Sequence, residues 1–314
     1  MSAARSFATP VPTGEGQGAA SPRAIDARAE TRGDARPNNR SDARALYGRF
    51  ADLVRDEIGV KLPPTKQLMV ESRLRRRMIN LGYATVQEYF QHLFAEGGLE
   101  AERDVIFDAV TTNKTDFFRE ISHFDLLAKT ILPAAHQRHQ RAGSMAKLWS
   151  AAASTGAEAY TMAMVSQLFA EANPGFGWGV LGTDINTEVL RQARTAIYSS
   201  DVIAPVPPDL RERFWMRGEG EHAGCWRIVP ELRQRTRFQR LNLMETNYPI
   251  DRDLDVIFLR NVLIYFGPED QERVIGAMAD HLVRGGHFIV GHSESMVVRD
   301  ARFTQIAPAV FVRS

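Results

Sequence analysis

The spacing of apolar residues changes once along this 314-residue chain, and that change constrains the fold more than any other feature. Between residues 43 and 110, apolar side chains recur every three or four positions, the period of helices with one buried face. From about residue 147 onward, short apolar runs alternate with helical patterns. We predict strands at 147–152, 178–183, 254–259 and 287–291, and helices at 158–172, 187–198 and 268–282. Such alternation is typical of an α/β fold, in which helices cover a parallel sheet.

The same patterns divide the chain into three parts. Residues 1–42 hold four Pro, four Gly and almost no large apolar side chains, so we expect a disordered tail. Residues 43–120 are predicted to form an N-terminal all-helical domain. Residues 121–314, which begin with a helix at 121–141, are predicted to form the sheet domain. Glycines and Pro230 interrupt the stretch at about 214–241, which we interpret as a small antiparallel β-subdomain.

The composition excludes several classes of protein. The chain has 39 Lys and Arg against 38 Asp and Glu, a net charge of +1 that argues against nucleic-acid binding by bulk electrostatics. Cys225 is the single cysteine, so the chain can form neither an intrachain disulfide nor a Cys-rich metal site. No apolar run reaches the ~18 residues of a membrane span. We therefore expect a cytoplasmic protein that binds neither nucleic acid nor a metal ion.

Polar residues follow the predicted strands where a ligand site is expected. In an open parallel sheet, ligands bind at the carboxyl ends of the strands. A small-residue turn around Gly156 follows the first strand, Asp184 follows the second, and Arg260 and Asn261 end the third. Asp184 could accept both hydroxyls of a ribose, or it could cap the helix that begins near Thr187. The chain lacks a GxxxxGK[ST] phosphate loop and a full GxGxxG fingerprint, so S-adenosylmethionine fits better than a nucleoside triphosphate or NAD.

Four separated motifs resemble those of the chemotaxis-receptor glutamate O-methyltransferases, the CheR family. They lie at 111–120, 149–158, 183–185 and 258–266, and residues 291–294 add a late strand and turn. The resemblance spans roughly residues 43–314. It implies a helical domain followed by a Rossmann-like class I methyltransferase domain with a small antiparallel β-subdomain. The implied activity is methyl transfer from S-adenosylmethionine to glutamate carboxylates of chemoreceptors, which yields glutamate methyl esters and S-adenosylhomocysteine.

The resemblance also implies roles for individual residues. The family's first motif usually continues after its glycine with two glutamates, a proline and a tyrosine, whereas this chain has Gly156-Ala157-Glu158-Ala159-Tyr160. The implied cofactor contacts are Asn113, Thr115, Arg119, Glu158, Asp184, Asn242, Leu243, Arg260 and Asn261.

Two residues are expected to orient the attacking carboxylate. Arg119 offers a planar fork of N–H donors, and Tyr265 offers one directional hydroxyl. Alternatively, Arg119 forms a surface ion pair with Asp116 or Glu120, and Tyr265 is a core aromatic residue beside Phe266. No general base is expected, because a glutamate with a pKa near ~4.3 is already ionised at pH 7.

Two surfaces are candidates for receptor binding. On the helix at 65–81, Lys66, Arg73 and Arg77 share one face, which we expect to attract an acidic helix of the receptor's cytoplasmic domain. The plainer alternative is a solvated helix face. The β-subdomain is similar to those of family members that hold a receptor C-terminal pentapeptide by strand addition. We expect a monomer that is recruited to membrane-bound receptor arrays.

Two other functions remain open at this point. One is an S-adenosylmethionine-binding signalling adaptor that methylates no receptor. The other is a methyltransferase for a different substrate; here the absence of an Asn/Asp-Pro-Pro-Tyr-like run after the third strand disfavours methylation of base amino groups.

Overall fold

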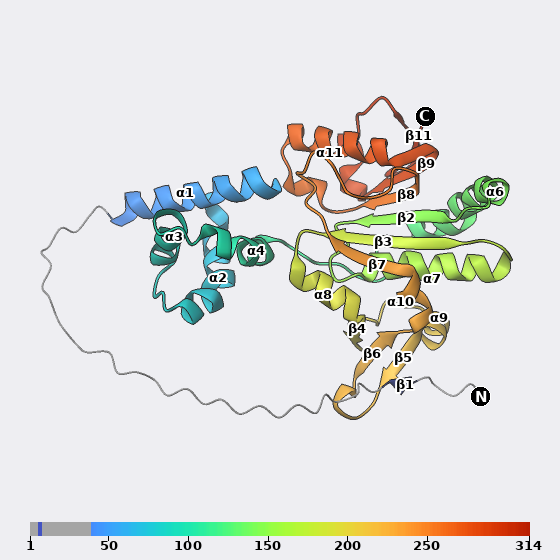
Figure 1. Cartoon of the computed structure of the whole chain (residues 1–314), viewed down its shortest axis with the longest axis horizontal. Helices are drawn as coiled ribbons and strands as arrows, with labels where there is room; N and C mark the ends of the chain where they lie inside the picture. The colour runs from blue at the N-terminus through green and yellow to red at the C-terminus, as the bar shows by residue number, and fades with distance from the viewer. Residues whose placement is uncertain (1–5, 8–38) are drawn as a thin grey trace, which may run out of the picture.

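The structure is a computed structural model that describes residues 6–7 and 39–314, and its helical domain lies beside the sheet domain (Figure 1). Most of the predicted tail lies outside the described residues. The first helix begins at Asn39, inside the stretch predicted as tail, and Ser6–Phe7 form a short strand, β1. The helical domain comprises α1 (Asn39–Ile58), η1 (Pro64–Lys66), α2 (Gln67–Leu81), α3 (Val86–Ala95) and α4 (Leu99–Val110).

Local signals set the ends of these helices. Pro64 begins η1, and Gly82 ends α2 in the left-handed conformation with φ 85°. Thr85 and Glu88 form a capping box at the start of α3. One apolar cluster joins the helices, and its fully buried members include Phe50, Val54, Val70, Leu74 and Tyr89. No helix among the described residues is long and apolar enough to cross a membrane.

The sheet domain is built on seven strands. They are β2 (Ala146–Ala151), β3 (Trp178–Asp184), β7 (Thr236–Arg240), β8 (Leu254–Leu259), β9 (Leu282–Val290), β10 (Phe303–Ala307) and β11 (Val310–Arg313). Their order is β10-β11-β9-β8-β2-β3-β7. The pairs from β9 to β7 are parallel, whereas β11 runs antiparallel to both β9 and β10. From β2 the chain first adds β3 and β7 on one side and then β8 and β9 on the other, so the strand order reverses between β2 and β8 and a crevice opens at their carboxyl ends.

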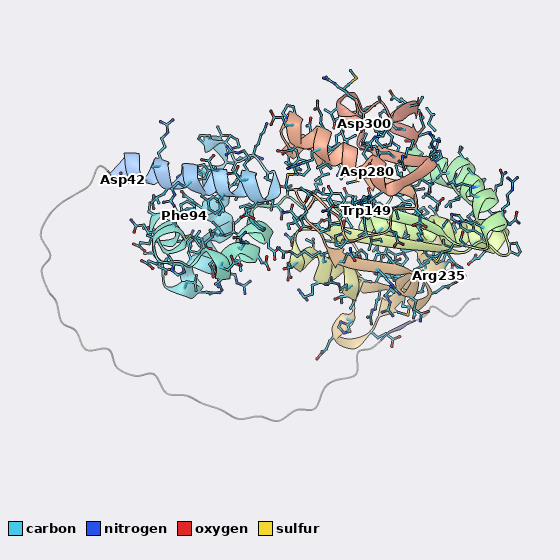
Figure 2. The ribbon with its side chains drawn as sticks, turned by 45° about the horizontal axis from the view of Figure 1, so that its top comes forward. Asp42, Phe94, Trp149, Arg235, Asp280 and Asp300 are labelled. Atoms are coloured by element: carbon cyan, nitrogen blue, oxygen red, sulfur yellow. The ribbon has the colours of Figure 1, made fainter. Side chains whose placement is uncertain are left out.

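Helices cover both faces of this sheet, as predicted. Alternate residues of β2 point to opposite faces: Leu148 packs in the cluster that contains α5–α7, and Trp149 packs in the cluster that contains α11. Figure 2 labels Trp149 inside this domain and Phe94 in the helical domain. The covering elements are α5 (Ser122–Leu126), η2 (Leu127–Ile131), α6 (Leu132–Ala142), α7 (Ala157–Ala172), α8 (Thr187–Thr195) and α11 (Pro268–His281).

The β-subdomain differs from the prediction at both of its ends. The helix predicted at 187–198 stops at Thr195, because Ala196 turns the backbone left-handed and Ile197–Ser199 form β4. At the other end, β7 pairs parallel with β3 in the main sheet, so it is not part of an antiparallel insertion. This strand of the main sheet was not predicted, because its solvent-facing arginines interrupt the apolar pattern by which a strand is recognised. The small sheet consists of β4, β6 (Cys225–Ile228) and β5 (Trp215–Gly218), which pair antiparallel, and β1 pairs parallel with β5. Three short helices flank or join these strands: α9 (Pro208–Phe214), η3 (Gly220–His222) and α10 (Pro230–Arg235).

Candidate functional site

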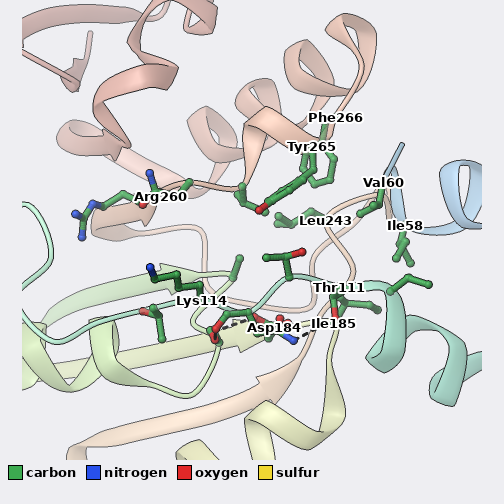
Figure 3. Close-up of a pocket in the computed structure, with 18 of the residues that line it drawn as sticks. Ile58, Val60, Thr111, Lys114, Asp184, Ile185, Leu243, Arg260, Tyr265 and Phe266 are labelled. Carbon is green, nitrogen blue, oxygen red and sulfur yellow. Dashed lines mark hydrogen bonds between the residues drawn. The ribbon is translucent and has the colours of Figure 1, made fainter. Parts of the chain in front are cut away.

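A pocket lies where the helical domain meets the carboxyl ends of the strands (Figure 3). The end of α1 and the loop after it form one wall, and the linker between α4 and α5 crosses the pocket. The ends of β2, β3 and β8 form its base. Every residue that the resemblance assigned to the cofactor lines this pocket, as does Tyr265: Asn113, Thr115, Arg119, Glu158, Asp184, Asn242, Leu243, Arg260, Asn261.

Asp184 ends β3 and is almost fully buried. Its Oδ2 accepts the backbone N–H of Ser154 (2.8 Å), and its Oδ1 accepts that of Asn186 (2.9 Å). Burial raises the pKa of Asp184, and the backbone N–H donors oppose that effect. The helix-cap alternative for Asp184 is wrong, because the Asn186 side chain caps α8 through the Val189 N–H (3.0 Å). Asp184 is therefore a preorganised acceptor that faces the pocket.

Arg260 carries the main positive charge at the base of the pocket. Its side chain is only 2% exposed, and it lies 3.0 Å from Glu158 Oε2 and 3.0 Å from Glu120 Oε2. Ser150 also donates to Glu158 (2.7 Å). Burial raises the pKa of Glu158, whereas the Arg260 charge acts in the opposite direction. One guanidinium thus balances two carboxylates that come from different parts of the chain.

Among the described residues, one cluster has the composition of a metal site. Ligand atoms of Glu120, His123 and His292 lie within 4.8 Å of one another. Burial lowers the pKa of His123 to about 4, so its imidazole is neutral at pH 7. Arg260 already neutralises Glu120 at the same oxygen, and this pairing disfavours a second cation there.

The linker between the domains presents Asn113 and Arg119. The Asn113 carbonyl accepts a hydrogen bond from Ser154 Oγ (2.7 Å), which fixes the linker to the turn after β2. Within the described part of the chain, Arg119 Nη1 donates to the Lys114 carbonyl (3.4 Å) and no other hydrogen bond of its guanidinium is found. The predicted alternative, an ion pair of Arg119 with Glu120, is not formed, because Glu120 pairs with Arg260. The Arg119 guanidinium therefore keeps most of its donors for a ligand.

Asn261 and Tyr265 stand on the short segment after β8. Asn261 has a left-handed backbone with φ 59°. Tyr265 ends η4 (Leu263–Tyr265), lines the pocket, and lies under the ammonium of Lys66, 5.8 Å from the ring centre. Asn242 reaches the helical domain, since its Nδ2 donates to the Glu57 carbonyl (2.6 Å).

Sequence reasoning missed the helical domain's share of the pocket. Ile58, Val60, Leu62 and Met69 line it, and only a docking role had been expected for this domain. The sequence held one signal, a glycine at residue 59 directly after the last residue of α1. In the structure Gly59 has φ 73°. A Cβ atom there would lie 2.6 Å from Met244 Sδ, so the glycine permits the domains to meet closely.

The predicted basic docking face is largely engaged inside the helical domain. Arg73 donates to the carbonyls of Ala109, Val110 and Thr111 at the end of α4 (3.3, 3.2 and 2.8 Å). Arg77 forms an ion pair with the buried Glu102, with bonds of 2.5 and 2.8 Å. Lys66 lines the pocket. The periodicity placed these side chains on one face, but it could not show that α4 already binds two of them.

The two alanines that depart from the family's first motif are buried in the sheet domain. Ala157 and Ala159 are fully buried in the cluster that covers one face of the sheet. Gly156 has φ 89°, and a Cβ atom there would lie 3.0 Å from Ala193 Cβ and 3.1 Å from Phe238 Cζ. The two alanines are therefore packing residues, and Glu158 alone carries charge from this turn into the pocket.

Two family models match consecutive parts of the chain. Residues 45–111 match the family model "CheR methyltransferase, all-alpha domain", and residues 113–312 match "CheR methyltransferase, SAM binding domain". The chain is 40% identical over 258 residues to Chemotaxis protein methyltransferase 2 of Pseudomonas aeruginosa, covering 80% of this chain and 88% of that protein. It is 36% identical over 270 residues to Chemotaxis protein methyltransferase of Escherichia coli, covering 86% and 91%. A TehB-like SAM-dependent methyltransferase from Corynebacterium glutamicum is 14% identical, with 62% and 100% covered and a TM-score of 0.32, a likeness too weak to carry an argument.

Proposed function

Because the chain belongs to the CheR methyltransferase family, whose members use S-adenosylmethionine and act in chemotaxis, we propose that it methylates glutamate carboxylates of chemoreceptors. One observation carries the proposal. Arg119 and Tyr265, the two donors suited to a carboxylate, line the same pocket as Asp184, Glu158 and Arg260. A nucleoside ligand and an attacking carboxylate can therefore meet in one cavity.

The pocket residues fit S-adenosylmethionine. The two Asp184 oxygens accept one backbone N–H each and keep further acceptor capacity for ribose hydroxyls. Glu158 supplies a negative charge for the amino group, and Arg119 supplies donors for the carboxylate of the cofactor. Asn113, Thr115, Asn242, Leu243 and Asn261 complete the proposed cofactor-binding set. When bound, the cofactor supplies an electrophilic methyl group on a sulfonium.

The protein's contribution to the reaction is alignment. The substrate carboxylate is ionised at pH 7, so no residue needs to remove a proton from it. Holding reacting groups at ~3 to 3.5 Å in the right orientation can lower a barrier by about 7 to 11 kcal/mol. The Tyr265 hydroxyl donates one hydrogen bond to the carboxylate oxygen that does not attack. Arg119 helps to orient the charged groups but does not bind the attacking oxygen tightly. A tight bond from Arg119 would reduce the nucleophilicity of that oxygen.

The direct test is transfer of radiolabelled methyl from S-adenosylmethionine to receptor-containing membranes. We expect base-labile label on the receptor, because a glutamate methyl ester is hydrolysed by mild base. If the purified protein binds S-adenosylmethionine but esterifies no receptor, it is a signalling adaptor. Base-stable label, or label on another molecule, would instead identify a methyltransferase for a different substrate.

The receptor partner is proposed to dock on α2. Leu68 and Ile79 are 79% and 64% exposed, and Arg75 and Arg76 lie between them on the same exposed face. This face combines apolar contact with positive charge, which suits an acidic, amphipathic segment of a receptor's cytoplasmic helical domain. The protein is accordingly proposed to act as a monomer in the cytoplasm at receptor arrays.

A second contact is proposed at the small sheet. Edge strands carry unpaired backbone groups that can accept a receptor C-terminal pentapeptide by strand addition. In the described structure β1 already pairs with the β5 edge through Ser6 and Phe7. Calorimetric titration with aromatic-containing C-terminal pentapeptides tests this contact, and no heat at high micromolar peptide would remove it.

A further inference from the structure

Glu294 is a buried carboxylate that does not line the pocket but contacts the segment that carries two pocket residues. It lies in η5 (His292–Val297), directly after β9, and is 1% exposed. Its Oε2 accepts the backbone N–H groups of Asn261 (2.7 Å) and Gly291 (2.8 Å). Its Oε1 accepts the backbone N–H of Ile264 (3.3 Å). One side chain therefore joins the loop after β9 to the loop after β8.

These bonds hold the backbone on both sides of the proposed catalytic rim. Asn261 has φ 59°, a left-handed conformation that non-glycine residues rarely keep unless their surroundings stabilise it. The bond from the Asn261 N–H to Glu294 stabilises this conformation. Ile264 immediately precedes Tyr265 in η4, so its bond fixes the turn that aims Tyr265 into the pocket.

The packing around this carboxylate leaves little room for adjustment. A Cβ atom at Gly291 would lie 2.6 Å from Asn261 Nδ2, 2.7 Å from Glu294 Oε2 and 3.1 Å from Asn261 N. The absence of a side chain at residue 291 thus lets the two loops approach closely enough for the Glu294 bonds to form. Gly291, Asn261 and Glu294 form one interlocked unit, although 30 residues separate the two loops in the sequence.

We propose that Glu294 is a positioning residue for methyl transfer. It holds Asn261 and Tyr265 in place and itself contacts neither the methyl donor nor the receptor carboxylate. The proposal rests on the proposed function, since it assigns Glu294 an effect on Tyr265 as an orienting donor. An ionised carboxylate is suited to this task because it can accept several N–H bonds at once, whereas an amide has a single acceptor oxygen. The Glu294→Gln change therefore removes at least one bond and points amide N–H groups at backbone N–H groups.

The test is a double-mutant cycle on receptor methylation. Glu294→Gln is expected to lower kcat/KM by about 10- to 100-fold, the range for displacing an aligned group by about 1 Å. If Glu294 acts through Tyr265, much of that loss is already present in Tyr265→Phe. The loss in the double variant should then be at least about fivefold smaller than the product of the two single losses. Losses that multiply would overturn the proposal, as would unchanged kcat/KM in Glu294→Gln.

Glu102→Gln is the matched control. Glu102 is also a buried carboxylate, at 2% exposure, but it bonds Arg77 and Tyr89 inside the helical domain. This change should lower the melting temperature, keep kcat/KM within about twofold, and combine multiplicatively with Tyr265→Phe. If Glu294→Gln does not fold, Gly291→Ala enters the same cycle, because its Cβ crowds both Asn261 and Glu294 Oε2 and so disturbs the same bonds without removing the carboxylate.

A second readout separates this proposal from the proposed function. If the wild-type protein esterifies no receptor, the proposed function fails, and the cycle is run on S-adenosylhomocysteine affinity with Asn261→Ala in place of Tyr265→Phe. Non-multiplicative losses there would still support Glu294 as the residue that positions Asn261. Multiplicative losses would remove the inference.

Discussion

At the scale of single residues, the Arg260 guanidinium determines how charge is distributed under the pocket. It contacts carboxylates from α7 and from the interdomain linker, and it also lies over the rings of Phe258 and Phe124 (5.8 and 5.5 Å). A buried charge is tolerated only when it is paired and hydrogen-bonded, and Arg260 meets both conditions. The Arg260 charge therefore opposes the burial that raises the pKa of Glu158.

Tyr265 gives the sharpest prediction at this scale. Tyr265→Phe removes one hydroxyl and should lower kcat/KM for receptor methylation by about 10- to 100-fold, because a hydrogen bond to a charged group contributes about 1.5 to 3 kcal/mol. The dissociation constant for S-adenosylmethionine should stay within about threefold. Initial-rate kinetics and calorimetry measure the two quantities.

The matched control is Tyr83→Phe in the helical domain, where the ring packs near Tyr89 and His92 and lies outside the pocket. It should leave both constants unchanged. Equal kcat/KM in wild type and Tyr265→Phe would remove the orienting role of the hydroxyl.

Sequence reasoning was effective for single residues at strand ends. Asp184, Arg260 and Asn261 follow apolar runs directly, and the sheet topology brings them together. It could not predict the partners of these groups. Glu120 meets Arg260 across 140 residues, and Glu294 meets Asn261 across 33, so neither pair leaves a local pattern in the sequence.

At the scale of elements, α2 separates its arginines into two sets. Arg73 and Arg77 bond to α4, although Arg73 also remains exposed, whereas Arg75 and Arg76 lie with the exposed Leu68 and Ile79. Helical periodicity predicted α2, its buried residues and its two ends. Which arginines bond to α4 depends on where α4 packs, and the period of α2 does not contain that information.

Charge reversal tests this assignment. Arg75→Glu combined with Arg76→Glu should raise the apparent KM for receptor by about 10-fold, since rim charges at an interface contribute mainly to encounter and orientation. S-adenosylmethionine affinity should not change. Arg44→Glu combined with Arg49→Glu on α1 is the control for a general change in net charge. Equal KM increases in the two double variants would contradict a specific docking face.

At the scale of the whole molecule, the contact between the domains is as important to the pocket as either domain. Gly59 and Gly82 both have positive φ, but only Gly59 has neighbours within 4 Å of an added Cβ. Gly59→Ala should weaken S-adenosylmethionine binding by at least about 10-fold, because the Cβ collides with Met244 and with Phe266, which lines the pocket.

Gly82→Ala provides the control, because it incurs the backbone strain of a left-handed residue without a steric contact, at a cost of about 1 kcal/mol. It should lower stability but keep cofactor affinity. Calorimetric titration of both variants with S-adenosylmethionine measures their affinities. Equal affinities of Gly59→Ala and Gly82→Ala would show that the close approach of the domains is unimportant for the pocket.

Acid sensitivity is a second property of the whole molecule. Burial lowers the pKa of His123 and of His287 to about 4, whereas both titrate near 6.5 when unfolded. Between these values the unfolded chain binds more protons, so stability falls as the pH drops from 6.5 toward 4. Each histidine contributes at most about 1.4 kcal/mol per pH unit.

Urea unfolding of wild type and His287→Asn at pH 7.5 and 5.0 measures the effect. Arg138 and Asp255 face His287 and are present in both proteins, so their contributions cancel in the comparison. The variant should lose less stability on acidification than wild type. Parallel losses would show that His287 is protonated equally in the folded and unfolded states.

The pocket wall formed by the end of α1 makes any bound molecule a bridge between the domains. Such a molecule contacts Ile58 and Val60 on one side and Asp184 and Tyr265 on the other, so it binds most tightly when the domains are closed. Thermodynamic linkage is reciprocal, and a filled pocket must hold the domains together by the same free energy. Because α2 belongs to the helical domain, a filled pocket is expected to fix the proposed docking face of α2 relative to Tyr265. By the same reciprocity, the methyl donor and the receptor are expected to strengthen each other's binding, whichever of them binds first.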